Sequence, residues 1–468
     1  MLGLIIGQLL PWLVGSAGIA YLWRNPAPGR GALILGYGYL AGSLALTLWM
    51  RALSVLGIAF GWTSIALPLL AAIAIAAWLL RRRRALVLSP LRIDRSALEL
   101  GGEFSRLHLA LWWLFVALIA AHLALAALEI VWRPLFPWDA WTQWATKTRV
   151  WYALQRIVPF ADLTTWLGGN TYTDAVPNYP ANLPLLQVWA CIALGRWDDS
   201  LMNLPSLSFA LALGFGFYGQ LRYAGRGALF AIVGAYAVLS LPLLDTHVAL
   251  AGYADFPLAV YYSLAAIALW QWSIAHDRAQ LALAAILAVA CPLTKNPGWV
   301  WLLTLIPALI VTLLPKRGLR IVYGLVVAVI LALIALSQAD VTVFSYRLRS
   351  TFQPVWEPLW QNYYEFANWH LLWYLLPAVM LLNYRRLLLP PLIAGTVTVA
   401  SGLGFLFVVF SFSNAAAWVA DYSTVNRATL HLAPLLVFYV LGLAHSAVRA
   451  LDANGKADAA PLPAQERA

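Results

Sequence analysis

Charged side chains are scarce in this chain. Only 10% of its 468 residues are Asp, Glu, Lys or Arg, and 62% are hydrophobic. This composition leaves too few polar residues to cover a soluble globular protein, so that class is excluded. The hydrophobic residues form repeated continuous runs of about 15 to 26 residues, a length that fits membrane-spanning helices. The sequence therefore predicts an all-α, polytopic membrane protein.

Cysteine and acidic residues are also few. The two cysteines, Cys191 and Cys291, lie in apolar surroundings, which excludes a disulfide framework and a cysteine-based metal site. Asp and Glu number 19 against 30 Lys and Arg, for a formal net charge of +11. Most of these bases lie in short connectors between apolar runs, as in the four arginines at 81–84. The positive-inside rule explains that placement, so the positive charge does not indicate nucleic-acid binding.

Thirteen apolar segments are predicted to span the membrane. If the arginines at 81–84 are cytoplasmic, the basic connectors at 222–226, 316–320 and 385–386 are cytoplasmic as well. The first segment has neither a basic start nor a small-residue cleavage site, so we expect a retained helix rather than a signal peptide. The predicted spans are 3–23, 31–50, 55–80, 109–131, 201–220, 227–244, 256–273, 279–294, 298–314, 321–337, 368–382, 387–412 and 429–448.

These spans divide the chain into three parts. Residues 1–106 comprise three leading helices and a short cytoplasmic linker, and residues 107–450 form the main transmembrane module. Residues 451–468 are a polar cytoplasmic tail that we expect to be disordered. The apolar segment 182–194 is too short to cross a hydrocarbon core of about 30 Å. We expect it to form a helix along the outer membrane face, within the first large outer loop.

Several basic residues fall on the outer side, where the positive-inside rule disfavours them. A ligand that carries phosphate would explain this placement, because Arg and Lys pair with phosphate oxygens. Headgroup phosphates of ordinary lipids are the alternative partners. A Lys at membrane depth needs an anionic partner in any case, either a phosphate or a carboxylate. The candidates for binding a donor phosphate are Lys147, Lys295, Arg347 and Arg427.

The densest group of polar and aromatic residues follows the fourth span, at 136–147. Asp139 lies there at the predicted mouth of a cavity, where a carboxylate can act as a general base on an acceptor hydroxyl or amine. The alternative is that Asp139 only caps the helix that begins at Ala140. Tryptophans recur beyond it at helical spacing, which predicts a surface helix with an aromatic face. The aromatic candidates for contacting sugar or acceptor are Trp138, Trp141 and Trp144.

Other outer segments contribute further candidates for binding sugar or acceptor. A loop at 174–184 contains three prolines, so it is predicted to be extended or tightly turned. A small-residue turn at 244–257 contains two acids and a histidine, and another histidine lies about one turn inside the last span. Metal binding would need more ligands at identifiable spacing, so no metal ligands are predicted and a divalent cofactor stays open. These candidates are Asn178, Tyr179, Asp245, His247, Asp255 and His431.

The order and spacing of three elements resemble the GT-C superfamily of integral membrane glycosyltransferases, which use polyprenyl-phosphate sugars. The three elements are the acidic first outer loop at Asp139, the segment 252–257 and the segment 293–298. The chain is similar in this respect to the protein mannosyltransferase-like and lipid A aminoarabinose transferase-like branches. The resemblance covers residues 109–448 and implies that Asp139 serves as the catalytic base.

Functions of different classes remain open at this point. The leading hypothesis is an inverting transferase at the outer face of a bacterial cytoplasmic membrane, in which bases hold the donor phosphate and Asp139 deprotonates the acceptor. A transporter or flippase of lipid-linked sugars would instead place ionisable residues near the midplane, with broken helices in symmetric halves. A glycan polymerase or ligase is a further alternative. The expected partners are a lipid-linked donor, the bilayer and an acceptor that is a glycan, lipid or protein, without nucleic acid.

Overall fold

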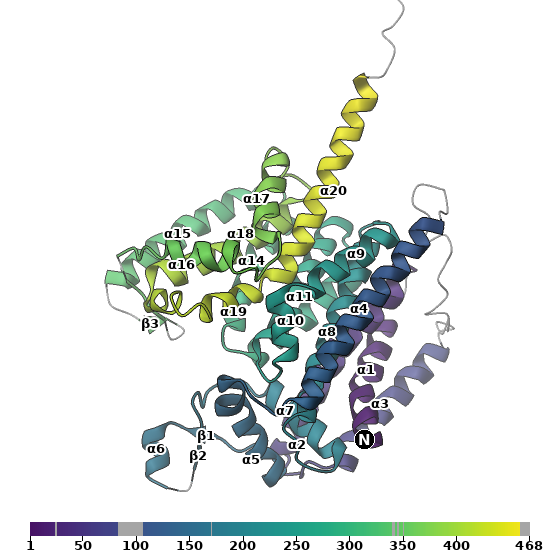
Figure 1. Cartoon of the computed structure of the whole chain (residues 1–468), viewed down its shortest axis with the longest axis vertical. Helices are drawn as coiled ribbons and strands as arrows, with labels where there is room; N and C mark the ends of the chain where they lie inside the picture. The colour runs from purple at the N-terminus through teal and green to yellow at the C-terminus, as the bar shows by residue number, and fades with distance from the viewer. Residues whose placement is uncertain are drawn as a thin grey trace, which may run out of the picture.

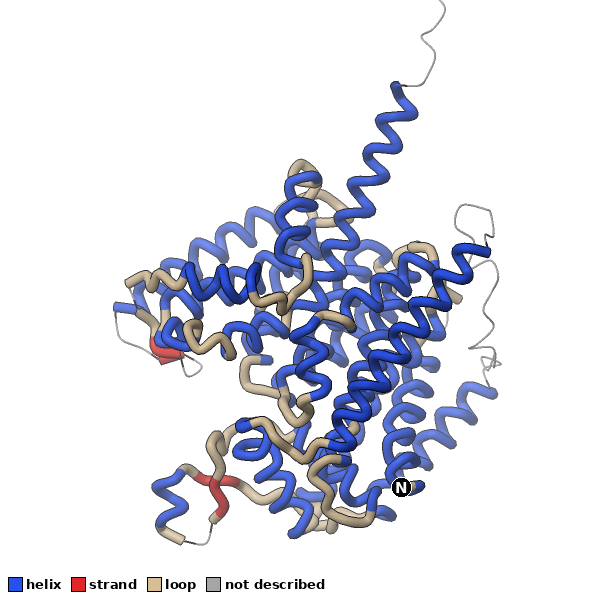
Figure 2. The backbone as a smooth tube through the Cα atoms, viewed as in Figure 1, coloured by secondary structure: helices blue, strands red, loops and turns tan. Residues whose placement is uncertain are grey.

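The computed structural model describes residues 1–23, 26–82, 106–169, 171–338, 342–343, 346–349 and 351–458. Within these residues the chain is helical nearly throughout, as Figure 1 and Figure 2 show. The strands are two-residue segments. β1 (Phe160–Ala161) runs parallel to β2 (Tyr172–Thr173), and β3 (Thr342–Val343) runs antiparallel to β4 (Tyr346–Arg347). The architecture is compatible with the predicted all-α, polytopic membrane protein.

Eight helices in the described part of the chain are long and apolar enough to cross a membrane. A helix satisfies its own backbone hydrogen bonds, which is why long apolar runs fold this way in lipid. They are α1 (Leu2–Leu22), α2 (Arg30–Val55), α3 (Trp62–Arg82), α4 (Arg106–Trp132), α8 (Pro205–Tyr223) with the preceding turn η3 (Leu201–Asn203), α11 (Asp255–Ala275), α15 (Gly318–Gln338) and α18 (Ile393–Phe412).

Two further spans are broken. α9 (Ala228–Leu239) and α10 (Pro242–Ala249) meet at a bend of 65°. α19 (Thr424–Leu430) and α20 (Ala433–Asp458) meet at a bend of 53°. Pro242 lies at the first bend, where it restricts the residue before it and lacks a backbone N–H. Counting each bent pair as one span raises the total in the described residues to ten.

The remaining apolar helices are too short to count as spans by length. A helix of 17 residues such as α12 is about 26 Å long, less than the hydrocarbon core. Every one of the thirteen predicted spans coincides with helical structure, but the number thirteen is not confirmed. The short helices are α7 (Asn182–Leu194), α12 (Arg278–Thr294), α13 (Gly298–Leu303) with α14 (Ile306–Leu313), and α17 (Leu372–Leu382).

The loop that was predicted to be the first large outer one is packed more deeply than expected. α7 (Asn182–Leu194) is the short helix predicted there, but it is apolar on nearly all sides and lies buried against α1, α2 and α5 (Thr146–Leu154). The aromatic segment before it is the π-helix η2 (Ala140–Ala145), which continues into α5. Trp144 and Trp151 are buried, so the predicted aromatic face turns inward and only Trp141 of its tryptophans is exposed. The segment keeps an exposed face, but its tryptophan face packs into the protein, partly against apolar α7.

The leading helices belong to the same bundle as the rest. α2 packs along α8, and Tyr37 on α2 donates a hydrogen bond to the backbone oxygen of Leu264 on α11 at 2.8 Å. α1 and α2 approach so closely that a Cβ atom on Gly42 would lie 1.7 Å from the backbone oxygen of Pro11. Glycine at such crossings permits backbones to touch, as is common between membrane helices.

α11 lies at the centre of the molecule. Its apolar window is 83% buried, and it packs against α8, α12, α14, α18 and α20. Its first residue, Asp255, therefore begins inside the protein rather than at its surface. The last helix, α20, continues to Asp458, so the expected disorder of 451–468 does not begin at residue 451. The linker at 83–105 and residues 459–468 lie outside the described residues. The short elements left are α6 (Leu163–Leu167), α16 (Trp356–Trp360), η4 (Gln361–Glu365) and η5 (Asn414–Trp418).

Candidate active site

Asp255 is the centre of a buried group of ionisable side chains. Only 1% of this residue is exposed. Its Oδ1 accepts hydrogen bonds from Lys295 Nζ at 2.5 Å and from His431 Nε2 at 3.0 Å. Its Oδ2 accepts hydrogen bonds from Arg427 Nε at 3.1 Å and Nη2 at 3.0 Å. A carboxylate buried this deeply must be compensated by opposite charge and hydrogen bonds, and these three partners supply both.

Arg427 extends this group to a second carboxylate. Its Nη1 donates a hydrogen bond to Asp139 Oδ2 at 2.5 Å. The Asp139 side chain is 22% exposed, whereas that of Asp255 is 1% exposed, so Arg427 joins an accessible acid to an inaccessible one. The Asp139 side chain makes no capping hydrogen bond to η2, so the capping-only alternative is not supported. We call the five residues together the Asp255 cluster: Asp139, Asp255, Lys295, Arg427 and His431.

The protonation of His431 follows from its two neighbours. Trp301 Nε1–H can only donate, and it lies 3.0 Å from His431 Nδ1, which must therefore be the unprotonated nitrogen. The proton is then on Nε2, which donates to Asp255. His431 is thus a neutral ring held in one tautomer. With two acids, two bases and a neutral histidine, the Asp255 cluster has no net charge.

Two local features of the backbone bring Asp139 and Asp255 together. Gly252, between α10 and α11, has a φ of +104°, which favours glycine. A Cβ atom there would lie 2.9 Å from Leu135 and 3.0 Å from Ala140, so glycine also permits close contact with the start of η2. The bend between α19 and α20 follows Arg427, where the helix axis changes direction beside α11.

Aromatic rings lie beside the cluster. The Arg427 guanidinium lies 4.7 Å from the centroid of the Tyr253 ring, a cation–π arrangement. Trp144 and Tyr179 stack in parallel, with centroids 5.1 Å apart and 12° between their planes. Burial, reinforced by the negative charge of Asp255, raises the pKa of Tyr179 to about 12, so its hydroxyl remains protonated. The predicted candidate Tyr179 therefore lies within the electrostatic reach of the cluster, and Trp144 stacks on it.

Lys147 belongs to a separate ion pair. Its Nζ lies 2.7 Å from Asp174 Oδ2 and donates a hydrogen bond to the backbone oxygen of Val176 at 2.8 Å. Both side chains of the pair are buried. Burial lowers the pKa of Lys147, and burial also raises the pKa of Asp174 despite their contact. Of the four predicted phosphate-binding bases, Lys147, Lys295 and Arg427 thus have carboxylate partners.

The other predicted site residues are more dispersed. Arg347 is exposed on β4, where its backbone N–H donates to the Asn414 side chain. Trp138 and Asn178 are exposed. Asp245 pairs with His122 of α4 at 3.1 Å, and His247 is buried next to the Tyr253 ring.

Sequence reasoning missed three participants. Trp301 orients His431, Asp174 compensates Lys147, and His122 compensates Asp245. Trp301 and His122 lie inside apolar runs. The sequence of such a run does not distinguish a residue that contacts a charged group from an ordinary core residue. Asp174 lies in the proline-rich loop at 174–184, but the sequence predicted no partner for it.

The described residues contain no metal-binding group, and the chain matches no known protein in the comparisons made. No group of three or more His, Cys, Asp or Glu side chains in the described residues could hold a metal ion. Comparison of the chain with family models, with curated proteins and with solved structures gives no match.

Proposed function

We propose that this protein is an inverting membrane glycosyltransferase that moves a sugar from a polyprenyl-phosphate donor to an acceptor at the outer membrane face. The observation that carries the proposal is the bridge formed by Arg427 between accessible Asp139 and buried Asp255. It places a candidate base next to a fixed positive charge, the two elements that transfer from a phosphate leaving group requires.

Each side chain of the bridge has a distinct role in this proposal. Asp139 takes the proton of the acceptor hydroxyl or amine, and the acceptor atom forms a bond to the anomeric carbon from the opposite side. The bond between that carbon and the phosphate oxygen breaks, and its electron pair stays on the phosphate. Arg427 has five N–H donors, and its contacts with the two acids leave two of them for phosphate oxygens.

Asp255 serves as a positioning residue. It holds Arg427 through two hydrogen bonds and is itself held by Lys295 and His431, so the guanidinium is oriented before substrate arrives. Protonation of Asp139 weakens its attraction to Arg427, which strengthens the pull of Arg427 on the leaving phosphate at the same moment. Among the four candidate bases, Arg427 is therefore assigned to the phosphate, and Lys295 acts through Asp255.

The test compares two Asp-to-Asn variants in the same outer loop. Asp139→Asn keeps the side-chain size but cannot accept the acceptor proton, so we expect transfer at least about 100-fold slower with donor binding retained. Asp162→Asn is the matched control, because Asp162 caps α6 and Asn caps equally well. The assay uses purified protein, a radiolabelled polyprenyl-phosphate sugar and product separation. Near-parental transfer by Asp139→Asn would remove Asp139 from the mechanism.

A transporter of lipid-linked sugars is the second candidate, and the broken helices favour it. α9–α10 and α19–α20 are interrupted, and transporters use such breaks to expose backbone groups at a substrate site. Reconstitution into vesicles with fluorescent lipid-linked sugar separates the two functions. Movement of lipid between leaflets without product formation supports transport, whereas product formation supports transfer. A polymerase or ligase would be recognised by a product carrying repeated or preassembled glycan.

A further inference from the structure

The helix that carries Arg427 is short. α19 has seven residues, too few for its own backbone hydrogen bonds to make it stable. At its start the Asp421 side chain accepts hydrogen bonds from the N–H groups of Ser423 and Thr424, and at its end the chain bends into α20. These two contacts fix the ends of α19. They do not fix its rotation about its own axis, which decides where the Arg427 guanidinium points.

The π-helix η4 supplies further contacts to α19. Three consecutive residues of η4 form side-chain hydrogen bonds, one to a residue just before α19 and two to residues within it. The two within α19 are three positions apart and therefore lie on one side of the helix. The pairs are Gln361 with Tyr422 at 2.7 Å, Asn362 with Asn426 at 2.5 Å, and Tyr363 with Thr429 at 3.0 Å.

The pair Asn362–Asn426 is buried on both sides. Asn362 is 0% exposed and Asn426 is 4% exposed. The Asn362 amide nitrogen donates to the backbone oxygen of Pro358 at 2.8 Å, and that of Asn426 also donates to the backbone oxygen of Tyr422 at 2.7 Å. Each nitrogen thus faces acceptors, which determines how both amides are oriented. Rotation of α19 would leave buried donors unpaired, so these contacts favour one rotation.

η4 is in turn anchored to α17. The Tyr363 ring stacks on the Trp373 ring, with centroids 4.3 Å apart and 27° between the planes. The Tyr374 hydroxyl donates to the backbone oxygen of Tyr364 at 3.2 Å. α17 packs against α20 in the helical bundle. The hydrogen bonds from η4 therefore connect α19 to a helix that is itself held in place.

Three local costs accompany this arrangement. Tyr422 has a φ of +58°, which is uncommon for a residue other than glycine. Asn426 Oδ1 is buried and finds no hydrogen-bond partner in the described part of the chain. η4 itself is a π-helix, a rare form that is frequent at functional sites. Such costs persist only where surrounding structure imposes them, and they gather at functional sites. Here they gather next to Arg427.

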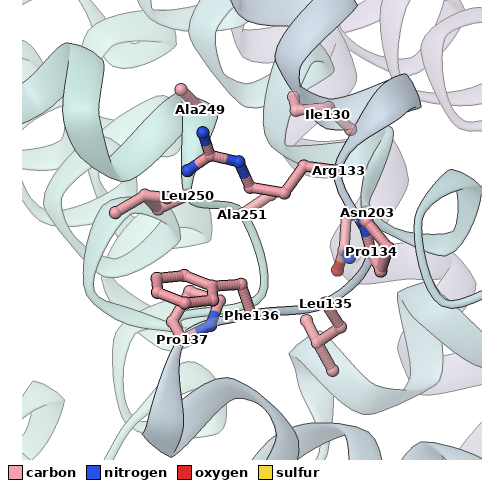
Figure 3. Close-up of a pocket in the computed structure, with 10 residues that line it drawn as sticks. All are labelled: Ile130, Arg133, Pro134, Leu135, Phe136, Pro137, Asn203, Ala249, Leu250 and Ala251. Carbon is pink, nitrogen blue, oxygen red and sulfur yellow. The ribbon is translucent and has the colours of Figure 1, made fainter.

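The other half of the Asp139–Arg427 bridge is held by close packing. The loop before Asp139 lies against the connection between α10 and α11, and Figure 3 shows the cavity left between them. Its volume is about 10 Å³, which is room for one water molecule. The loop therefore has little freedom to move, whereas the placement of Arg427 depends on the contacts of α19.

We infer that Gln361, Asn362 and Tyr363 are positioning residues, which set the rotation of α19 and thereby direct the Arg427 guanidinium toward its two carboxylates. They act through α19 rather than by contact with a substrate. The inference rests on the proposed function only for the purpose of this alignment, which is to present the remaining N–H donors of Arg427 to a phosphate.

Modification of Arg427 by phenylglyoxal tests the inference without any substrate. The reagent reacts with arginine side chains, and peptide mapping by mass spectrometry gives the rate at Arg427 in the full-length protein in lipid nanodiscs. Tyr363→Phe removes the hydrogen bond to Thr429 and keeps the ring that stacks on Trp373. We expect modification about fivefold faster than in the parent, because a loosened guanidinium leaves its carboxylates more often.

Tyr439→Phe is the matched control for this variant. The Tyr439 hydroxyl also bonds to a threonine, Thr396 at 2.9 Å, but between α18 and α20. Its removal should leave the rate at Arg427 within about twofold of the parent. Equal rates in Tyr363→Phe and Tyr439→Phe overturn the inference.

A second pair of variants removes the buried amide contact. Asn362→Leu keeps the volume of the side chain and loses its hydrogen bonds to Asn426 and Pro358. Asn383→Leu is the control, because Asn383 is buried at the far end of α17 and donates to two backbone oxygens there. Both should lower the melting temperature, but only Asn362→Leu should speed the modification of Arg427, by about fivefold. The same acceleration in Asn383→Leu would trace the effect to general loss of stability and overturn the inference.

Transfer kinetics separate the inference from the proposed function. If both hold, Tyr363→Phe and Asn362→Leu lower kcat about fivefold and leave KM for the acceptor unchanged, because Arg427 acts on the leaving phosphate. Faster modification in a protein that transfers no sugar keeps the positioning role and removes the transferase. Transfer at parental kcat by both variants keeps the transferase and overturns the positioning role.

Discussion

At the scale of single residues, the site is organised by pairing rather than by isolated charges. Lys295 and Arg427 stood out in the sequence as bases on the disfavoured side of the membrane, and the structure gives both of them Asp255 as a partner. The sequence identified which residues are unusual because charge in an apolar chain is conspicuous. It did not identify which acid pairs with which base, because partners such as Asp255 and Arg427 are separated by 172 positions in the chain.

The Lys147–Asp174 pair illustrates the cost of burying charged groups. The pKa of Lys147 is lowered and that of Asp174 is raised, so burial disfavours the charged form of each more than their attraction favours it. The unfolded chain therefore binds protons more tightly at Lys147 and less tightly at Asp174, and both shifts reduce stability while the pair is ionised.

We predict opposite outcomes for single and double replacements of this pair. Lys147→Met alone leaves a buried carboxylate unpaired and should cost about 3–5 kcal/mol of unfolding free energy at neutral pH. Combining it with Asp174→Leu removes both charges and should restore or exceed the parental stability. Thermal unfolding monitored in detergent gives the comparison. A double variant no more stable than the single one would show that the pair is net stabilising.

At the scale of helices, periodicity and apolar length predicted where helices occur but not how they end or bend. The sequence predicted each of the two broken spans as one continuous helix. An apolar run shows the length of a span but does not show where its helix changes direction. A signal was present in the sequence, since Pro242 and Pro434 each lie at the beginning of a second half-helix. The inward turn of Trp144 was not predictable either, because it depends on the separate helix α7 packing against it.

The crossing of α1 and α2 provides a prediction at this scale. Gly42→Ala places a methyl group against the Pro11 carbonyl, so the helices must separate, at a cost of about 1–3 kcal/mol. Gly18→Ala on α1 is the matched control, because nothing lies within 4 Å of its added methyl group. Alanine has the higher helix propensity, so this control should be neutral or slightly stabilising. Melting temperatures of both variants test the contact, and equal values contradict it.

At the scale of the whole molecule, the positive-inside rule predicts which ends of the helices face the outer side of the membrane. On that orientation, the beginnings of α11 and α19 and the end of α12 face the outer side, which is where the Asp255 cluster assembles. The sequence anticipated that the candidates share one end of the bundle.

Cysteine labelling tests this orientation. Thr164 is exposed in the first large outer loop, and Arg317 is exposed in the connector between α14 and α15. In intact cells a membrane-impermeant maleimide should label Thr164→Cys and leave Arg317→Cys unlabelled until the membrane is permeabilised. The native cysteines are buried, so they contribute little background. Labelling in the reverse order would invert the assigned faces and place the Asp255 cluster in the cytoplasm.

The balance of charge within the Asp255 cluster has a consequence for how reactants arrive. Two acids and two bases packed within hydrogen-bonding distance cancel one another a short way from the site, so the cluster projects almost no field into solution. Long-range attraction therefore does not concentrate an anionic lipid near it. For the lipid donor that we propose, encounter is governed by two-dimensional diffusion, and its frequency depends on the mole fraction of that lipid in the bilayer rather than on its bulk concentration or on ionic strength.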